Sequence, residues 1–358
     1  VVKVFFANLK RGGILLIQIA VGSLYMFSVP RGYTDGFIQW CKQIIGLCLL
    51  PEAAALCLAA TLRAHGHTRQ AMYVTLIVNL ITFVGNLLLL YGWFGLPQLG
   101  VAGVAISTVA GRIVGVVLLV WLVARKTGIR LRLPEIVRPS RAMLDKVLHI
   151  GLPAAGENLS WMLQFMVVTA FVGLLGDKAL ATQSYFFQIC LFILLFGLSI
   201  GLGNEIIIGH LAGARRFEQA YRQLIKSLKL GLIVTSLIAI AAALNGRAII
   251  SLFTDDADII TQVAQLFLIS LILEPGRTFN LVVINALRAT GDARFPLYMA
   301  LVSMWGIAVP LAYFLGIMQG YGLVGIWLAL ACDEWVRGLA MFWRWRSRRW
   351  QNKILVET

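Results

Sequence analysis

Charged residues are scarce in this chain. They make up 13% of its 358 residues, whereas apolar residues make up 59%, and the mean hydropathy is +0.84. A soluble domain carries about a quarter charged residues, so this composition excludes most soluble folds. Acids are the rarest charged residues, because 16 Asp and Glu stand against 31 Lys and Arg.

Residues for metal, disulfide or catalytic chemistry are equally few. The chain has four His and five Cys, with neither a ligand cluster nor a CxxC spacing among them. The cysteines all lie in apolar segments, where they act as small hydrophobes. No loop is long enough for a soluble catalytic site, and none carries a nucleophile–base or phosphate-binding pattern. The sequence therefore predicts no enzyme, no metal site and no bound cofactor.

Long apolar segments recur along the whole chain. A spanning helix needs roughly 20 mostly apolar residues to cross about 30 Å of hydrocarbon. These segments are too long and too continuously apolar for the alternating strands of a barrel. We therefore expect an all-α, polytopic membrane helical bundle. About ten transmembrane helices are expected, near 12–30, 37–61, 71–94, 98–123, 148–174, 183–210, 228–251, 260–286, 296–318 and 321–343.

Basic residues concentrate in alternate loops. Of the 31 Lys and Arg residues, 24 fall in runs that should face one side: 1–11, 62–70, 124–147, 211–229, 287–295 and 344–358. The opposite loops are acidic, as at Asp255, Asp256 and Asp258. This asymmetry follows the positive-inside rule and predicts a cytosolic C-terminus. It also explains the net charge of +15 without a nucleic-acid partner.

An internal repeat divides the chain. LRAHGHTRQAMYV (62–74) resembles LRATGDARFPLYM (287–299): at a common offset of 225, Arg63, Gly66, Arg69 and Tyr73 fall on Arg288, Gly291, Arg294 and Tyr298. Each copy follows a Pro-containing helix and precedes a long helix, a glycine-rich turn and a final helix. We expect an N-terminal lobe at 1–135 with four spans and a C-terminal lobe at 136–358 with six. If both lobes contain six helices, we expect two further helices before Val1 and a parallel orientation of the two lobes in the membrane.

Four segments together resemble the MATE (multidrug and toxic compound extrusion) transporters. They are LHIGLPAAGENL (148–159), GLSIGLGNEIIIGHLAGARRFEQAYR (197–222), LEPGRTFNLVVINALRATGDARFP (273–296) and GYGLVGIWLAL (320–330). The resemblance implies two MATE-like six-helix lobes that form a V around a central cavity. It also implies export driven by a proton or sodium gradient. The partners would be a small-molecule substrate and membrane lipids, for a monomer in the bacterial inner membrane.

Glu157 is the first candidate for the transport site. It stands about nine residues, or roughly 14 Å, into its expected helix, which is close to the membrane midplane. Trp161 and Gln164 follow at i+4 and i+7 on the same face. An acid beside an aromatic ring and an amide suits a flat organic cation or a proton-titrating carboxylate. The alternative is an acid that hydrogen-bonds between helices for packing.

Glu274, Arg277 and Asn280 form the second candidate group. Glu274 and Arg277 stand at i and i+3 and can pair internally, so a structural pair and a substrate site are equally open. Sodium-coupled MATE relatives carry an acid where Arg277 falls, so their coupling residue is not transferred to this position. Tyr185 and Gln188 either line the cavity or bond between helices.

A third group lies near the C-terminus. Asp333 and Arg337, at i and i+4, predict a structural pair that leaves Glu334 unpaired. Arg112 stands 225 residues before Arg337 and is its counterpart in the other half.

Two transport functions remain open at this point. The first is a secondary-active exporter that alternates access and exchanges an amphipathic aromatic solute, such as an organic cation or a flavin, for H⁺ or Na⁺. The alternative is a lipid-linked oligosaccharide flippase of the same superfamily. The expected midplane holds at least as many acids as bases, which favours the exporter, since flippase cavities are strongly basic.

Overall fold

The computed structural model describes residues 49–92, 98–99, 101–128 and 141–353, and every regular element within these ranges is helical. The expected span at 12–30 and the part of the next span at 37–48 lie outside the described residues. The chain divides into two compact units, Val2–Val147 and Leu148–Thr358. The boundary near 135 stays a prediction.

The described part of the smaller unit contains α4 (Leu49–Ala64), α5 (Thr68–Tyr91) and α6 (Val101–Thr127), and α6 packs against both other helices. The turn between α4 and α5 passes through Gly66, whose φ of +80° favours glycine. Apolar side chains from all three helices form the core of this unit: Leu58, Leu62, Ala71, Val74, Leu119 and Val123.

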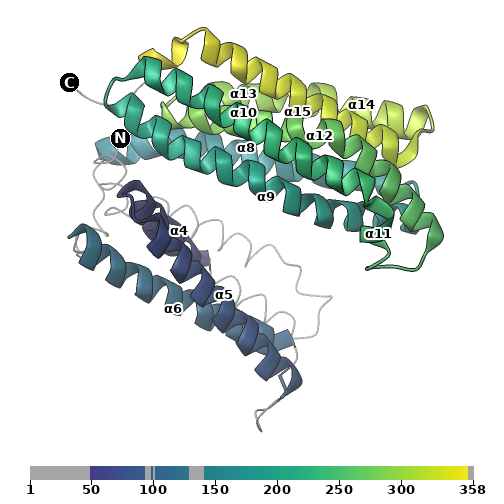
Figure 1. Ribbon diagram of the computed structural model, residues 1–358, viewed down its shortest axis with the longest axis horizontal. Helices are drawn as coiled ribbons and strands as arrows, with labels where there is room; N and C mark the ends of the chain where they lie inside the picture. Colours follow the sequence, from purple (N-terminus) through teal and green to yellow (C-terminus); the bar gives the residue numbers. More distant parts are fainter. Residues whose placement is uncertain (1–48, 93–97, 100, 129–140, 354–358) are drawn as a thin grey trace. The chain divides into compact units, whose positions relative to one another are not determined.

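The larger unit consists of long helices that run side by side (Figure 1). α12 lies at its centre and packs against α9, α10 and α15. The elements in order are α8 (Arg141–Gly173), α9 (Asp177–Gly213), α10 (Phe217–Leu244), α11 (Gly246–Ile250), α12 (Ala257–Ala289), α13 (Arg294–Ser303), η2 (Met304–Ala308), α14 (Val309–Tyr313), η3 (Phe314–Met318), α15 (Gly322–Arg346) and η4 (Arg349–Lys353).

The helices confirm the all-α expectation, and most begin and end within a few residues of the expected spans. α8 and α10 begin earlier, at 141 and 217 rather than 148 and 228. Their first turns are polar, and an apolar criterion misses helix that continues beyond the hydrocarbon. The span at 294–318 changes to π-helix at η2 and η3, on either side of Pro310, which lacks the N–H for a regular α-helical bond.

Six of the described helical stretches meet a strict length and hydropathy criterion for membrane spans. α8 and α15 are not among them, because Glu157, Gln164, Asp333 and Arg337 interrupt their apolar surfaces. These two helices therefore carry buried polar groups in their membrane segments, as α12 does at Glu274 and Asn280, and such groups mark functional candidates.

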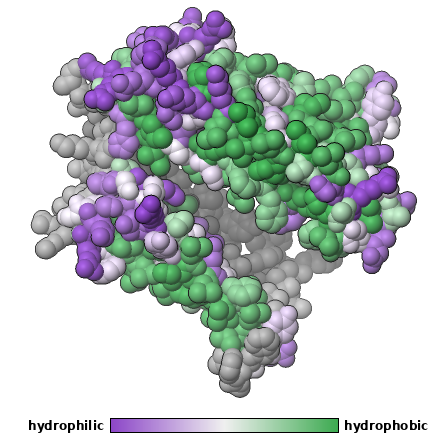
Figure 2. All heavy atoms as spheres, viewed as in Figure 1, coloured by the Kyte–Doolittle hydropathy of each residue, from purple (hydrophilic) through white to green (hydrophobic). Residues whose placement is uncertain are grey.

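A broad apolar surface covers the larger unit. Figure 2 shows a hydrophobic band with hydrophilic residues toward both ends. On α10 the exposed apolar side chains recur at helical spacing: Leu230, Ile233, Leu237, Ile240 and Leu244. A soluble monomer rarely exposes so large an apolar patch. Together with the spans, this surface makes the chain a multi-pass membrane protein.

The two ends of the larger unit differ in charge. At what we name the acidic end, Asp256 caps α12 by accepting hydrogen bonds from the backbone N–H groups of Asp258 and Ile259, and Lys178 lies 3.5 Å away. The bond from Ile259, with that from Asp258 and the charge of Lys178, lowers the pKa of Asp256. The cap therefore stabilises the helix at neutral pH and is lost as the pH falls through that lowered value.

The other end, named here the basic end, gathers the turns after α9, α12 and α15. Arg348 bonds to Glu218 at 2.9 Å, and Arg344 bonds to Asp292 at 2.7 Å. The indole of Trp350 stacks on Trp345 with 4.2 Å between ring centroids. These contacts fix the C-terminal η4 turn on the ends of the neighbouring helices.

Glycine permits the close packing of α15 on the preceding span. A Cβ on Gly325 would lie 2.7 Å from the carbonyl carbon of Leu315 and 3.0 Å from the backbone nitrogen of Gly316. Backbone atoms cannot move aside as a flexible side chain can. The contact therefore requires glycine at this position.

We expect Gly325→Ala to destabilise the protein by about 1–3 kcal/mol, as overpacked cores do. The measurement is thermal unfolding of purified protein in detergent. Gly203→Ala is the matched control, because nothing lies within 4 Å of a Cβ on Gly203. An unfolding temperature for Gly325→Ala equal to that of the control would contradict this view of the packing.

Candidate functional site

The local sequence of α12 brings its polar side chains close to α15. Pro275 interrupts the α12 hydrogen-bond ladder, and Gly276 leaves room for the indole of Trp335, whose Nε1 would lie 2.6 Å from a Cβ there. That Nε1 donates to the carbonyl of Ile272 at 2.9 Å. The two helices therefore meet where α12 carries Glu274 and Arg277.

Five charged side chains from these two helices form what we name the α12–α15 charge cluster: Glu274, Arg277, Asp333, Glu334 and Arg337. Arg277 lies 2.9 Å from Glu274 and 3.9 Å from Glu334. Arg337 lies 2.8 Å from Asp333 and 3.0 Å from Glu334. Each side chain is at most 13% exposed. Glu334 therefore joins the two arginines into one network.

Neutral groups complete the network. Asn280 donates to Glu334 at 2.9 Å, and the hydroxyl of Ser303 donates to Asp333 at 2.5 Å. Three carboxylates still face only two guanidinium groups, so the fully ionised cluster carries one negative charge. Burying an uncompensated charge is costly. One oxygen of Glu274 is also buried without a hydrogen-bond partner.

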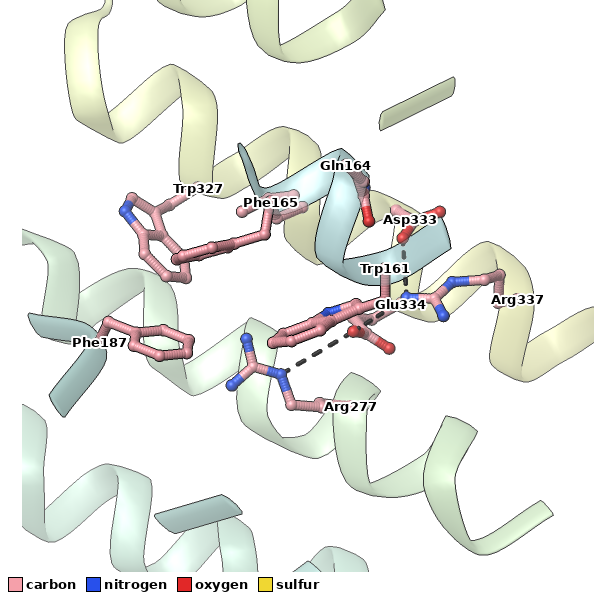
Figure 3. Close-up of a pocket in the computed structure, with 10 residues that line it drawn as sticks. Trp161, Gln164, Phe165, Phe187, Arg277, Trp327, Asp333, Glu334 and Arg337 are labelled. Atoms are coloured by element: carbon pink, nitrogen blue, oxygen red, sulfur yellow. Dashed lines mark ion pairs between the residues drawn. The ribbon is translucent and has the colours of Figure 1, made fainter. Parts of the chain in front are cut away.

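A pocket opens beside the cluster (Figure 3). Its interior is about 20 Å³, which admits a water molecule or a small cation but no aromatic solute. The rings of Trp161 and Phe165 stack with centroids 5.7 Å apart, and Phe165 lies 4.8 Å from Phe187. The lining residues are Trp161, Gln164, Phe165, Phe187, Arg277, Trp327, Leu330, Asp333, Glu334 and Arg337.

The structure brings several predicted site residues together. Trp161, Gln164 and Arg277 line the pocket, Glu274 belongs to the cluster, and Asn280 donates a hydrogen bond to it. The predicted ion pairs Glu274–Arg277 and Asp333–Arg337 are both present.

Other predicted residues lie elsewhere. Glu157 does not line the pocket and instead pairs at 2.6 Å with Arg288, in the last turn of α12. This placement matches the alternative given above, in which the acid forms a contact between helices for packing. Tyr185 is half-buried against the apolar core, and Gln188 is exposed on α9. Neither is among the residues that line this pocket.

One expectation was wrong. Glu334 was expected to be unpaired, but it contacts Arg277, Arg337 and Asn280. The contact with Arg337 has i, i+3 spacing and could have been found from the sequence. The contacts with α12 join residues more than 50 positions apart, and no local pattern indicates them.

The internal repeat relates the charge cluster to a simpler ion pair in the smaller unit. In the smaller unit, Glu52 pairs with Arg112, 60 residues later. The offset of 225 maps these positions onto Arg277 and Arg337, so an acid–base pair in one lobe corresponds to two arginines in the other. Glu334 lies between those arginines. Position 277 therefore carries a positive charge where its counterpart Glu52 carries a negative one. The three acids of the cluster compensate for this change and outnumber the two arginines by one charge.

Comparison with known proteins agrees with this architecture. The MatE family model matches residues 153–314. The uncharacterized transporter YisQ of Bacillus subtilis is 40% identical over 355 residues, which are 97% of this chain and 78% of YisQ. The probable multidrug resistance protein NorM of Thermotoga maritima is 25% identical over 83% of this chain, and the chain spans 64% of its length.

Solved structures show the same fold. An outward-facing multidrug resistance MATE family transporter of the MOP superfamily superposes with a TM-score of 0.84 at 16% identity, over 98% of this chain and 84% of that one. A second family model, conjugal transfer protein TrbL, matches residues 1–97. Most of those residues also fall within the alignment to YisQ, because that alignment leaves only 3% of the chain uncovered.

The helical spans define a multi-pass membrane protein, and the family match makes it a transporter rather than an enzyme. The chain belongs to the MATE family.

Removing the guanidinium group of Arg337, which Asp333 and Glu334 share, should lower the stability of the protein. We expect Arg337→Met to leave Asp333 and Glu334 buried beside each other and to destabilise the larger unit by about 3–5 kcal/mol. The measurement is thermal unfolding in detergent at pH 7. The comparison is Arg112→Met, which removes the repeat-related arginine but leaves only Glu52, whose side chain is 37% exposed. An equal or larger loss of stability in Arg112→Met would contradict this description of the cluster.

Proposed function

We propose that the protein exports amphipathic aromatic organic solutes by alternating access, in exchange for H⁺ or Na⁺ bound at the α12–α15 charge cluster. The observation that carries the proposal is a buried cluster one positive charge short of neutrality, beside a pocket of about 20 Å³. A space of that size suits the coupling ion rather than the solute.

Uptake of one cation would change the forces between three helices. It would neutralise the cluster of α12 and α15, against which α8 places Trp161 and Gln164. The amide nitrogen of Gln164 is buried without a hydrogen-bond partner. The cluster with a bound cation and the cluster without it would therefore favour different positions of α8. A coupling ion shifts a conformational equilibrium only if it interacts differently with the two conformations in this way.

The class of solute follows from aromatic and charged side chains. Trp161 is 38% exposed and stacks on Phe165, so it offers a ring face to a flat molecule or an organic cation. NorM relatives are named multidrug resistance proteins, which supports organic cations as the first class to test. Arg277 makes an anionic aromatic such as a flavin the second. The acid excess of the cluster disfavours an anionic lipid-linked sugar.

We place the protein in the bacterial inner membrane as a monomer, with the basic end in the cytosol. The bacterial origin of its relatives supports that membrane. The orientation rests on the positive-inside rule, because the basic end carries Arg215, Arg216, Arg346 and Arg349.

The test is export by a pump-deficient bacterium that expresses the full gene product. A fluorescent organic cation and a flavin are loaded separately, and either the proton or the sodium gradient is collapsed. Wild-type protein should export at least one of the two solutes. That export should stop when the gradient that drives it, of protons or of sodium, is collapsed. Export that persists without both gradients, or no export of either solute, would contradict the proposal.

Glu274→Gln tests the coupling site. An amide resembles a protonated carboxyl group, so the cluster is neutral without a bound cation, and gradient-driven export should fall at least tenfold. Glu218→Gln is the matched control, because Glu218 pairs with arginines on the surface of the basic end. Wild-type export by Glu274→Gln would exclude Glu274 from coupling.

A further inference from the structure

The span from α13 to η3 lies alongside α8 within the larger unit. Three close approaches join the two, in chain order Gly156 with Leu297, Ser160 with Trp305, and Phe171 with Tyr313. The approaches follow the same order along both helices, so the two helices run in parallel. The middle one is a hydrogen bond in which the indole Nε1 of Trp305 donates to the Ser160 hydroxyl at 3.0 Å.

The π-helical turn η2 keeps these residues on the side of α8. Tyr313 follows Leu297 by 16 residues, which is about four and a half turns of regular α-helix. A regular helix would therefore place the two residues on nearly opposite faces. In η2 the N–H of Val309 donates to the carbonyl of Met304, five residues back rather than four. This wider turn takes up one extra residue and directs Tyr313 toward Phe171 of α8.

The same span contacts the α12–α15 charge cluster. The Ser303 hydroxyl donates to one carboxylate oxygen of Asp333 at 2.5 Å, while the other oxygen pairs with Arg337 at 2.8 Å. Ser303 and Asp333 are at most 1% exposed, so this bond is shielded from solvent. Ser303 and Trp305 are two positions apart, which is about 200° around a helix. One short stretch of the span therefore bonds to the cluster on one side and to α8 on the other.

The residue held on α8 adjoins the pocket. Trp161 follows Ser160 directly and Gln164 follows it by one turn, and both extend from α8 to line the pocket beside the cluster (Figure 3). Ser160 is buried, and its hydroxyl also lies 3.5 Å from the sulfur of Met304. Two consecutive residues of η2, Met304 and Trp305, thus fix α8 at the level of the pocket.

We propose that the Ser303–Trp305 segment is the structural link through which the charge cluster acts on α8, with Ser303, Trp305 and Ser160 as positioning residues. This rests on the proposed function and names the contacts that couple its cation to its solute. A hydrogen bond to a charged carboxylate is about twice as strong as a neutral one. A cation on the cluster therefore weakens the bond from Ser303 to Asp333. η2 then shifts, and Trp305 moves Ser160 with it.

The π-helical geometry makes η2 the deformable part of this link. Its bonds depart from the regular ladder of α13 and α14 on either side, and π-turns of this kind are rare and frequently lie at functional sites. A shift of η2 changes the bond to Ser160 and the bond to Asp333 together, because the two bonds leave opposite sides of the same helix. The cluster and α8 therefore cannot change position independently.

The test measures how the affinity for a solute depends on the driving cation. The purified full gene product binds whichever probe it exports, the fluorescent organic cation or the flavin, at low and at high cation concentration. The Kd of the wild type should differ at least tenfold between the two conditions, because linkage is reciprocal. Trp305→Phe, Ser160→Ala and Ser303→Ala should each reduce this difference to about twofold or less. The Trp305→Phe, Ser160→Ala double variant should lose no more than either single variant, since both remove one bond.

Trp350→Phe is the matched control. The indole of Trp350 donates to the carbonyl of Trp345 at 3.0 Å, the same length as the bond from Trp305, but at the basic end. This variant should keep the wild-type difference in Kd. Thermal unfolding with and without the cation shows whether each variant still folds and still binds the cation. Stabilisation by the cation should persist in every variant, because none removes a charge from the cluster.

The possible outcomes separate the link from the proposed function. A wild-type difference in Kd in Trp305→Phe and Ser160→Ala would overturn the link and leave the exporter intact. An equal loss in Trp350→Phe, or losses that add in the double variant, would also overturn the link alone. Loss of cation stabilisation in the Ser160→Ala variant would do the same, because the substitution would then act on cation binding itself. A wild-type Kd that depends on neither H⁺ nor Na⁺ would overturn both proposals.

Discussion

The cost of burying charge in a helical membrane bundle is the constraint on which the larger unit depends. Hydrocarbon supplies no water to stabilise a lone carboxylate, so each acid of α12 and α15 must lie against a guanidinium group or take up a cation. Arg277 and Arg337 are each shared between two acids, with Glu334 common to both. The remaining negative charge is the basis of the proposed binding of a proton or Na⁺.

The backbone around the cluster is adapted to that constraint. Pro275 and Gly276 let α15 approach α12, and Gly325 lets α15 pack against the preceding span. α12 is the central helix, so a change in its charge state acts on neighbours on several sides. The repeat-related pair Glu52–Arg112 shows the simpler state, in which one acid and one base balance without further groups.

Much of this architecture follows from local sequence patterns. Apolar segments predict the helices, and the i, i+3 and i, i+4 spacings predict the pairs Glu274–Arg277 and Asp333–Arg337. What the sequence does not reveal depends on tertiary contacts. Arg288 lies 131 residues after Glu157, so no periodicity connects them. The early starts of α8 and α10 were missed because polar helical turns outside the hydrocarbon carry no apolar signal.

The most direct test of the central claim is the number of protons or sodium ions exchanged by the purified protein when a transported solute binds or leaves. We expect one cation per chain in the wild type and none in Glu274→Gln, because the cluster of that variant is neutral without a bound cation. Exchange of one cation by both proteins, or by neither, would contradict the claim that the unbalanced α12–α15 charge cluster is the coupling site.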